Sequence, residues 1–358
     1  MIIQFADDYT NHFRQWNIVL EHKGWIVKNL DLINGVAAII PKENLSQLLK
    51  AGVVKKAMAD IDVQSAGLIR SLQDLSNGQT IPWGHSRIQA PLSWMKGTGR
   101  GVRVAVLDTG IDNNHKDLKA NIKKRYNAVN TPGGTKDYLG HGTHIAGVIA
   151  AVDNTMGVVG TSPLAEINMV KVLYDDGIGF LSDLIEGIAW CIKNNMDVIN
   201  LSLGCREDHD FLHYAIQKAH EEGIIIVAAA GNIPGRVLYP ACYEETIAVS
   251  AVDSDNRCAS FSGFGKTIDV TAPGVDILST FTDGTYAVMD GTSISAAYVT
   301  GVVALVLSTP VVDVYDINGN GLWDPDEIKR KVLDSTETLG LSPEKQGRGL
   351  VRADWAVK

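Results

Sequence analysis

The chain has 358 residues, of which 45% are hydrophobic, and a formal net charge of −9. This length suits one large α/β unit together with a small one. The negative charge, the absence of a lysine or arginine cluster and the lack of an apolar run of membrane-spanning length argue against nucleic acid or a membrane as a partner. We therefore expect neither as a partner. We also expect a monomer, although nothing in the sequence fixes the oligomeric state.

The N-terminus lacks the features of a signal peptide. Its first eight residues include two acids and no basic segment followed by an apolar one. We therefore expect either a cytoplasmic protein or an extracellular protein from which a leader has already been removed.

Residues 1–64 have the pattern of a separate small unit. Four apolar runs predict strands at residues 2–5, 25–30, 36–40 and 53–61, and two amphipathic segments predict helices at 10–23 and 44–49. This β-α-β-β-α-β order is typical of the ferredoxin-like α+β fold, although the pattern alone suits many small modules.

Residues 65–78 join this unit to the rest of the chain. Leu68, Ile69, Leu72 and Leu75 recur there at helical spacing. On this pattern alone we expect a short amphipathic linker helix.

The remaining chain alternates apolar strands and helices, and two polar residues stand at the ends of such elements. Residues 102–107 predict a buried parallel strand that ends at Asp108. His141 opens an apolar helix, so it can face the crevice into which the strand delivers its carboxylate. Each residue also has an ordinary explanation, Asp108 in a strand-ending turn and His141 as a polar helix start.

Two more polar residues follow the same pattern further along the chain. Residues 224–230 predict a strand that ends in Gly231-Asn232, and Ser293 lies on a glycine-led turn before a helix at 293–308. The first N–H groups of that helix would stabilise negative charge beside the serine hydroxyl. An ordinary turn and an ordinary helix cap would use the same residue types.

Together these four residues suit acyl transfer. A serine becomes a strong nucleophile when a base takes its proton, and the base needs a carboxylate to fix its tautomer. Asp108, His141 and Ser293 supply these roles in one of the known chain orders. The side-chain amide of Asn232 can donate to the oxyanion of a tetrahedral intermediate.

The motifs around these residues resemble those of the subtilisin-like serine peptidases, over residues 79–358. Val-Ala-Val-Leu-Asp108-Thr-Gly, His141-Gly-Thr-His-Ile-Ala-Gly, Ala-Ala-Gly-Asn232 and Gly-Thr-Ser293 look like that family's acid, base, oxyanion and nucleophile segments. The resemblance implies a three-layer α/β fold with a mainly parallel sheet. It also implies a serine endopeptidase that acts on peptide and protein substrates.

The same resemblance implies a cleft in which two extended segments clamp a peptide as an added strand. Leu238 stands where the family often has a glycine, at the base of the pocket for the residue that precedes the cut. We expect a shortened pocket that prefers small or slim apolar residues, unless Leu238 turns into the core. The expected substrate-binding residues are Gly177, Ile178, Gly179, Ser202, Leu203, Gly204, Ala229, Ala230, Gly231 and Leu238.

Two positions after the nucleophile depart from the family pattern. Ala297 replaces a proline in the first helical turn, which changes rigidity but no chemistry. Tyr298 replaces a histidine and needs a buried hydrogen-bond partner or an exit to solvent. Because of these two departures, a calcium-binding pseudoenzyme remains an alternative function for the chain. Because no leader is recognised, a narrow-specificity intracellular processing peptidase remains another.

A small α/β unit directly before such a catalytic unit resembles the family's propeptide, which assists folding and inhibits until it is cut. The resemblance implies that residues 1–64 inhibit the catalytic unit of the same chain. The tail of this propeptide would then thread the active site and be cut by Ser293 within 65–78. Leu75 and Asn77 are candidates for the N-terminal side of the cut bond.

Residues 316–327 form an insertion that fits the calcium-loop template, with oxygen-bearing side chains at the ligand positions and a glycine at the sharp turn. The segment before it is not helical, so we expect a loop followed by one helix. Capping of that helix by Asp324 and Glu327 explains only part of the pattern. The expected Ca²⁺ ligands are Asp316, Asn318, Asn320, the carbonyl of Leu322, Asp324 and Glu327.

A second calcium site is implied by the family resemblance alone. Its loop would interrupt the helix that carries His141, and without the resemblance residues 153–157 are simply a turn. The implied ligands are the side chains of Gln79, Asp117 and Asn154 and the carbonyls of Val152, Met156 and Val158.

The four cysteines do not settle the redox compartment. Cys191 lies on the apolar side of a helix expected at 181–193, so we expect a buried free thiol. Cys205 and Cys242 lie in segments that the family places around the specificity pocket. The sequence does not decide whether these two cysteines form a disulfide, since pairing cannot be deduced from sequence.

Overall fold

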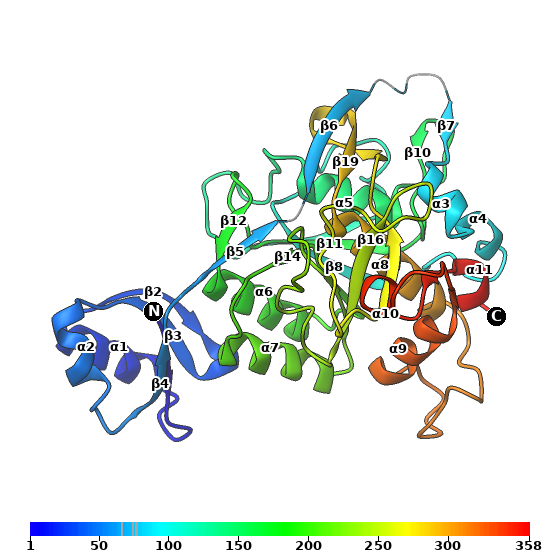
Figure 1. Cartoon of the computed structure of the whole chain (residues 1–358). Coiled ribbons are helices and arrows are strands. Elements are labelled where there is room, and N and C mark those ends of the chain that lie inside the picture. The colour runs from blue at the N-terminus through cyan, green and yellow to red at the C-terminus, as the bar shows by residue number, and fades with distance from the viewer. Residues whose placement is uncertain (66, 74, 76–77) are drawn as a thin grey trace.

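The computed structural model describes residues 1–65, 67–73, 75 and 78–358. A small N-terminal unit and a large unit are joined by a long extended segment (Figure 1). The large unit has three layers, because helices cover both faces of a central, mainly parallel sheet. The predicted three-layer α/β fold is therefore confirmed.

The central sheet has nine strands, and neighbouring strands are parallel except for one pair at an edge. Parallel strands with helices on both faces are buried on both sides, which explains their almost continuous apolar runs. In order across the sheet, the strands are β20 (Thr336–Glu337), β21 (Leu350–Val351), β17 (Val270–Pro273), β16 (Thr246–Val252), β15 (Ile225–Ala229), β13 (Val198–Leu201), β8 (Arg103–Asp108), β11 (Glu166–Lys171) and β9 (Ile122–Asn127).

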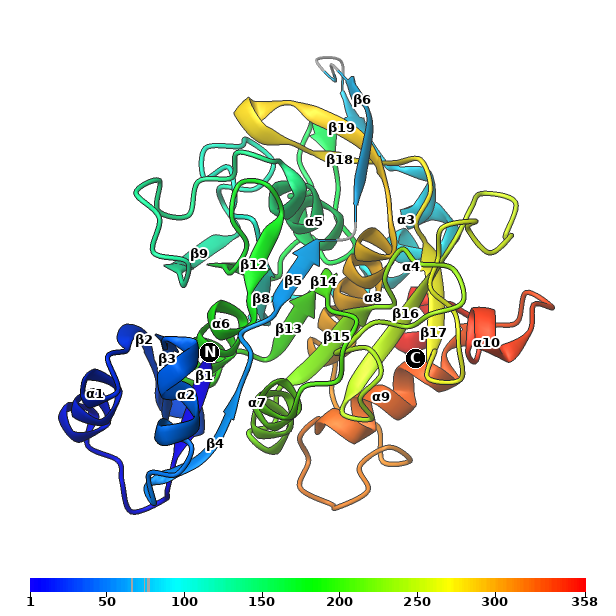
Figure 2. The same ribbon diagram turned by 60° about the vertical axis from the view of Figure 1, so that its left-hand side comes forward.

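Four long helices form the outer layers (Figure 2). On one face of the sheet lie α5 (His141–Ala150) and α8 (Thr292–Leu307), and on the other lie α6 (Leu181–Lys193) and α7 (Asp210–Glu221). In the part of the chain that the structure describes, no helix is long and apolar enough to cross a membrane.

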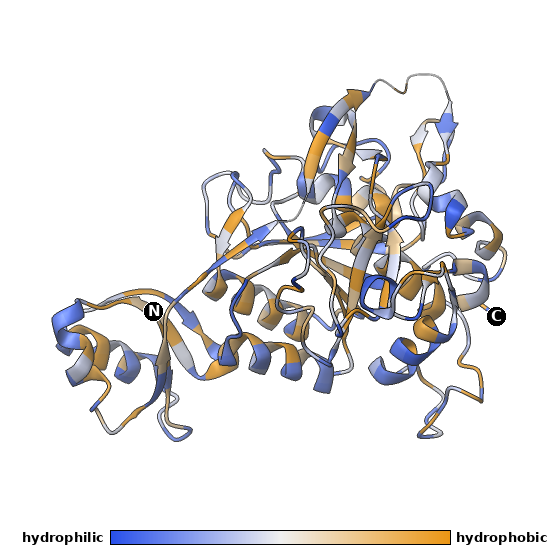
Figure 3. Cartoon of the chain, viewed as in Figure 1, coloured by the Kyte–Doolittle hydropathy of each residue, from blue (hydrophilic) through white to orange (hydrophobic). Residues whose placement is uncertain are grey.

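Strand β8 shows how the sequence divides the core between the two layers. Val104 and Val106 belong to the cluster that contains α5 and α8, whereas Ala105 and Leu107 belong to the cluster that contains α6 and α7. This alternation follows from the period of two residues along a strand. Orange, hydrophobic residues run through the central strands in Figure 3. Asp108 is thus carried at the end of a strand fixed from both sides.

Shorter elements surround this frame. Ile328 and Val332 of α9 extend the core around α8. The remaining helices of the large unit are α3 (Trp83–Arg87), α4 (Ala90–Ser93), α9 (Pro325–Asp334), α10 (Pro343–Gln346) and α11 (Ala353–Ala356). The large unit's own strands outside the central sheet are β7 (Gln79–Thr80), β10 (Gly157–Val158), β12 (Ile178–Phe180), β14 (Leu203–Gly204), β18 (Ile277–Thr280) and β19 (Tyr286–Asp290).

The N-terminal unit is a four-stranded antiparallel sheet with two helices. Its elements follow the β-α-β-β-α-β order of the sequence pattern. The last strand predicted, 53–61, is shorter in the structure and ends at Met58. The elements are β1 (Ile2–Phe5), α1 (His12–Glu21), β2 (Trp25–Leu30), β3 (Gly35–Ile39), α2 (Lys42–Leu48) and β4 (Val54–Met58).

The sheet of the N-terminal unit packs against α6 and α7. Leu30 and Ile33 share a buried cluster with residues of those helices. At the edge of this contact the ammonium group of Lys28 pairs with Asp183 and, at 2.8 Å, with Glu186. Burial alone would lower the pKa of Lys28, but the two carboxylates outweigh burial and raise it. The ion pairs therefore hold a charged lysine at the interface.

Polar contacts also fix the chain where it leaves the N-terminal unit. The carboxylate of Asp60 accepts the N–H of Ser182 at 2.9 Å and its hydroxyl at 2.7 Å. His209 donates from Nε2 to the carbonyl of Ala59 at 3.0 Å, while its Nδ1 accepts the N–H of Phe211. The first turns of α6 and α7 thus hold the segment that leads into the cleft.

The joining segment is extended in the described residues. It contains β5 (Asp62–Ser65) and β6 (Leu68–Gln73), so the expectation of an amphipathic linker helix is wrong. The side chains of Leu68, Ile69 and Leu72 are all exposed. Strand edges on the large unit offer backbone partners to this segment, and pairing outweighs its local helical spacing.

Candidate active site

The end of β8 and the start of α5 bring two predicted catalytic residues together. Nδ1 of His141 donates to Oδ1 of Asp108 at 2.7 Å, and both side chains are fully buried. In the described part of the chain, Nε2 of His141 has no hydrogen-bond partner. Gly142 lets the start of α5 come close to the segment after β8, because a Cβ at this position would lie within 2.2 Å of the Gly110 carbonyl. Asp108 therefore fixes the tautomer that leaves Nε2 free to accept a proton.

Two buried histidines on α5 show what the carboxylate does. Burial alone would lower the pKa of His141, but the charge and hydrogen bond of Asp108 outweigh burial and raise it. His144, one turn later, faces backbone carbonyls instead, and burial lowers its pKa to about 3. Of these two histidines, only His141 can therefore exchange a proton near neutral pH, and it is an unprotonated base only above its raised pKa.

Ser293 lies in the first turn of α8, as predicted. Its hydroxyl donates to the carbonyl of Ser202 at 2.9 Å, while the Ser202 hydroxyl donates to the Ser293 carbonyl at 2.8 Å. The serine oxygen is thus turned toward β14 and not toward His141 in this structure. Catalytic hydrogen bonds often form only when a substrate is bound. For Ser293 to give its proton to His141, its hydroxyl would have to turn away from Ser202.

Asn232 follows β15 and is held by the turn that carries the serine. Its side-chain carbonyl accepts the N–H of Thr292 at 3.1 Å and the hydroxyl of Thr292 at 3.0 Å. These bonds fix which way the amide faces, so its N–H₂ group is directed away from Thr292 and borders the cleft. An amide held in this way is a preorganised donor for an oxyanion.

Asp137 is a positioning residue that the sequence reading missed. Its buried carboxylate accepts the N–H of Gly140 at 2.8 Å and the N–H and hydroxyl of Thr143 at 2.8 and 2.7 Å. It also accepts the hydroxyl of Thr109, the residue after Asp108, at 2.9 Å. Burial raises the pKa of Asp137. An acid just before a predicted helix start was the available signal, because free N–H groups there need acceptors.

The predicted substrate-binding segments enclose part of the chain itself. β5 pairs antiparallel with β12 on one side and β14 on the other, with Ile178 opposite Gln64 and Leu203 opposite Ser65. The N–H of Ser65 also donates to the carbonyl of Gly177 at 2.9 Å. The N-terminal segment therefore lies between the two strands as a bound peptide would.

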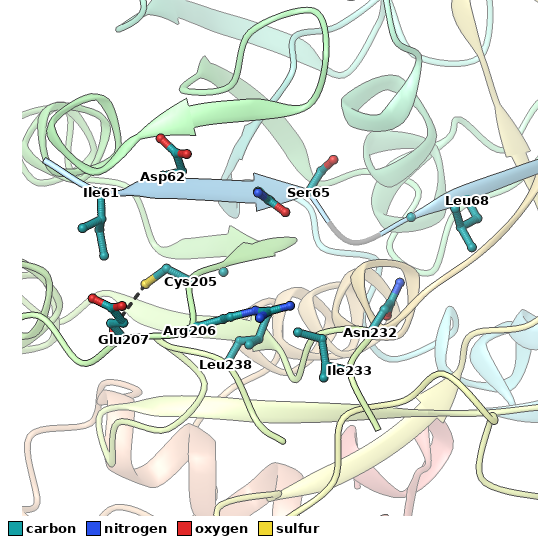
Figure 4. Close-up of a pocket in the computed structure, with 13 residues that line it drawn as sticks. Ile61, Asp62, Ser65, Leu68, Cys205, Arg206, Glu207, Asn232, Ile233 and Leu238 are labelled. Carbon is teal, nitrogen blue, oxygen red and sulfur yellow. Dashed lines mark hydrogen bonds between the residues drawn. The ribbon is translucent and has the colours of Figure 1, made fainter. Parts of the chain in front are cut away.

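A cavity of about 570 Å³ adjoins β5 (Figure 4). Leu238 lies across the cavity from β5, and a Cβ at Gly231 would come within 2.5 Å of its side chain. The N–H of Leu238 donates to the carbonyl of Ala230, just after Ala229 at the end of β15. Leu238 therefore borders the cavity and packs on Gly231. The lining residues are Ile61, Asp62, Gln64, Ser65, Gly67, Leu68, Gly204, Cys205, Arg206, Glu207, Asn232, Ile233 and Leu238.

Gly67 lies against the ring of His141. A Cβ at this position would come within 2.7 Å of Cδ2 and 2.9 Å of Nε2 of His141. Beyond Gly67, β6 pairs antiparallel with β19, with Leu68 opposite Asp290. β5 and β6 thus lie on different strand edges, with Gly67 beside His141.

The buried Tyr298 finds the partner that the sequence reading required. Its hydroxyl lies 3.4 Å from Nδ1 of His85, and the two rings meet edge to face at 4.7 Å. Burial lowers the pKa of His85 to about 4, so its ring is neutral and can accept that hydroxyl. The pair lies in the core next to Gly84. Asp108, His141 and Ser293 form their hydrogen bonds with other residues, so this departure from the family pattern leaves those bonds as described above.

The predicted calcium loop, residues 316–327, closes on itself. Oδ2 of Asp316 accepts the N–H of Gly321 at 3.1 Å, and Oδ1 of Asn320 accepts that of Leu322 at 2.6 Å. Oδ1 of Asp316 is buried, and within the described residues no donor reaches it. An orphaned carboxylate oxygen among other oxygen-bearing side chains fits a hard cation such as Ca²⁺.

Two residues of this loop also cap the helix that follows. Asp324 and Glu327 form a capping box on α9, in which Glu327 accepts the N–H of Asp324 at 3.1 Å. Oδ2 of Asp324 accepts amide N–H groups from Asn318 and Asn320 at 2.5 and 2.9 Å. The capping explanation is therefore correct for these two carboxylates, while it leaves Asp316 unexplained.

The second predicted calcium set converges between β7 and the segment after α5. The amide nitrogen of Gln79 donates to the carbonyls of Val152 at 3.0 Å and Val158 at 3.4 Å. The amide nitrogen of Asn154 donates to Oδ1 of Asp117 at 2.9 Å. Amide N–H groups thus contact the oxygens that a cation would bind, and a flip of the Gln79 amide would present its own oxygen. The residues fit a calcium ion.

Met156, the remaining member of that set, lies in the same turn and donates its N–H to Oδ1 of Asn154 at 2.7 Å. Over residues 1–65, 67–73, 75 and 78–358, no three His, Cys, Asp or Glu side chains gather closely enough to hold a metal ion. The set around Gln79 therefore depends mainly on amide and backbone oxygens beside Asp117. In the loop at 316–327, Asp324 and Glu327 are engaged in the capping box, which leaves the Asp316 carboxylate with amide and backbone oxygens.

The cysteines are all free thiols. Cys191 is buried in α6, as predicted. Cys205 and Cys242 do not form the disulfide that the sequence left open, and each thiol points to a backbone carbonyl of its own loop. Burial raises the pKa of Cys205 to about 11, so this thiol is protonated at neutral pH.

Comparisons with known proteins agree with this geometry. A sequence model described as the subtilase family matches residues 99–349. Subtilisin BL of Lederbergia lenta is 42% identical over 282 residues, which are 78% of this chain and 100% of the relative. An alkaline protease of Shouchella clausii shows the same identity over 78% of this chain and 70% of its own length. Subtilisin amylosacchariticus of Bacillus subtilis subsp. amylosacchariticus is 38% identical over 351 residues, 96% of this chain and 85% of the relative.

Proposed function

Because the chain belongs to the subtilase family, we propose that it cuts peptide bonds through a triad of Asp108, His141 and Ser293. The protein is a subtilisin-type serine endopeptidase with protein substrates. One observation carries the assignment of roles: the 2.7 Å bond from His141 to the buried Asp108 leaves an acceptor nitrogen facing the chain that lies in the cleft.

Each step of the proposed reaction uses a group described above. The Ser293 hydroxyl gives its proton to Nε2 of His141 as its oxygen attacks the substrate carbonyl. The Asn232 amide and the Ser293 N–H hold the negative oxygen of the tetrahedral intermediate. His141 then gives the proton to the leaving nitrogen as the C–N bond breaks, and water repeats the sequence on the acyl-enzyme.

We propose that the first substrate is the chain itself, cut at the bond that precedes Gly67. β5 occupies the clamp between β12 and β14, and Gly67 follows it beside His141. The candidates Leu75 and Asn77 are less suitable: Leu75 packs in a cluster with Tyr286 at the far end of β19, and Asn77 lies outside the described residues.

Residues 1–64 then act as an inhibitor after the cut. Their sheet packs on α6 and α7, Lys28 forms ion pairs with α6, and β5 fills the clamp. A product held by a folded unit leaves slowly, because many contacts must break together. Release of this unit would therefore open the cleft to other proteins.

Calcium would be held by the loop at 316–327 and by the set around Gln79 and Asp117. When bound, it would cross-link chain segments and stabilise the folded state, by an amount that grows with the logarithm of the free calcium concentration once that exceeds the Kd. We expect a chelator to lower the thermal midpoint of the Ser293→Ala chain, which cannot digest itself. Asp316→Asn should remove part of that response, and an equal midpoint with and without chelator would contradict both sites.

The direct test of the triad is hydrolysis of casein by the wild-type chain and by Ser293→Ala. In subtilisin, loss of the nucleophile lowers turnover by about six orders of magnitude, and we expect a comparable loss here. Ser295→Ala is the matched control, since that hydroxyl donates to the carbonyls of Ala272 and Pro273 away from His141. Equal activity of Ser293→Ala and wild type would rule out the proposal.

A further inference from the structure

Strand β6 lies where the part of a substrate beyond the cut bond would lie, and this reading depends on the proposed cut before Gly67. β6 pairs antiparallel with β19, and β19 leads through Gly291 directly to Ser293. Leu68 is opposite Asp290 and Ile69 is opposite Met289. The side chains that β6 presents to β19 therefore show which groups this side of the cleft accepts.

Arg70, the fourth residue after the proposed cut, meets two carboxylates there. Its Nε and Nη2 both contact Oδ2 of Asp290, and its Nε lies 3.5 Å from Oδ1 of Asp276. The side chain of Asp290 is only 4% exposed, and its other oxygen accepts the N–H of Asp276 at 2.7 Å. Within the described residues, neither carboxylate has another cationic partner. A nearly buried carboxylate is therefore satisfied on one side by backbone and on the other by a guanidinium.

We propose that Asp290 and Asp276 form a specificity subsite for arginine at the fourth residue after the cut bond. A guanidinium suits it because two N–H groups can point at one carboxylate while the charge remains near the second. Lysine offers the charge without the planar fork. A glutamate at this position would place a third carboxylate beside the other two, and an uncharged side chain would leave Asp290 without its counter-ion.

The test uses peptides that copy residues 61–73 with Arg70 kept or replaced by Lys, Gln or Glu. The processed wild-type enzyme should cut them with kcat/KM falling in that order, Arg above Gln by about fivefold, as a half-exposed charge pair allows. The enzyme's own β6 competes equally with all four peptides for the edge of β19. This competition therefore cancels in the ratio of kcat/KM values for two peptides measured on one enzyme. The Arg preference should shrink as salt is raised.

Asp290→Asn should reduce the ratio of the Arg to the Gln peptide to about one. Asp276→Asn changes a more exposed side chain and should reduce this ratio in part. This variant provides the test if Asp290→Asn does not fold. Asp255→Asn removes an exposed charge elsewhere and should leave the ratio unchanged. Equal rates for all four peptides with the wild-type enzyme would overturn the subsite while leaving the proposed function intact. Failure to cut any of them would overturn both.

Discussion

The two segments on either side of Gly67 are held in different ways. β5 lies between two strands and is continuous with a folded unit that packs on α6 and α7. β6 pairs with one strand edge, and its six residues are all exposed. Apart from backbone pairing, its main anchor is Arg70 with Asp290 and Asp276.

This difference predicts unequal behaviour after the proposed cut. The β5 side would stay bound through a large contact and inhibit, although it is no longer covalently attached. The β6 side would exchange on and off β19 readily, although it remains tethered to the catalytic unit, because a single strand edge and an ion pair whose arginine is half exposed contribute little. Inhibition should therefore depend on the N-terminal unit more than on β6.

Gly67→Val changes the residue that lies between β5 and β6, and it should slow self-cutting. The added Cβ would meet the His141 ring at 2.7 and 2.9 Å, so the segment must move away from the base. Overpacking of this kind costs about 1–3 kcal/mol, so we expect self-cutting to slow by roughly 10- to 100-fold. The measurement is the rate at which the shortened chain appears on a gel. Gly52→Val is the control, because no atom lies within 4 Å of a Cβ there, and equal slowing by both changes would contradict the placement of Gly67.

Leu238→Gly tests the pocket on the β5 side, which receives the residue before the cut. Leu238 borders the cavity beside β5, so its removal should deepen the pocket for the residue before the cut. We expect the wild-type enzyme to prefer Ala, Met or Leu over Phe at that position, and the variant to raise the Phe to Ala ratio of kcat/KM by about tenfold. Faster cutting after Phe than after Ala by the wild type would refute the pocket. The sequence itself has alanine before Gly67, in line with a small pocket.

Acid should loosen the β5 side by a smaller factor. Burial lowers the pKa of His209, which is neutral when its Nε2–H donates to Ala59. Once the N-terminal unit leaves, the pKa returns toward 6.5, so the free form takes up a proton that the bound form excludes. Binding is therefore full above about pH 6.5 and weakens as pH falls through and below that value.

The measurement is the fraction of cut N-terminal fragment that co-elutes with the catalytic fragment. We expect that fraction to correspond to roughly threefold weaker binding at about pH 5.5 than at about pH 7.5. His209→Gln should remove the difference. Binding that is unchanged or tighter at the lower pH would show that His209 does not titrate on release.

Most of the catalytic frame could be predicted from sequence, because its pattern is set by burial. β8 and α8 are apolar almost throughout, and such segments have one stable location between packed layers. Their ends then place Asp108 and Ser293 at one edge of the sheet. The order of the N-terminal elements followed from the same kind of periodicity.

What the sequence could not predict depended on partners distant in the chain. β6 has helical spacing, yet the edge of β19 makes it a strand. Asp137 gains its role only when the start of α5 and Thr109 meet around it. The hydroxyl of Ser293 takes its direction from Ser202, and Tyr298 takes its partner from a histidine near the N-terminal end of the catalytic unit. Such pairings are decided by tertiary contacts and not by local pattern.

The most direct test of the substrate-like path is the mass of the fragments formed by the wild-type chain over time, with calcium present and with Ser293→Ala beside it. We predict one early cut in the wild type alone, giving a catalytic fragment that begins Gly67-Leu68-Ile69-Arg70. A first cut after Leu75 or Asn77, or no cut at any protein concentration, would show that the segment in the cleft is not the enzyme's first substrate.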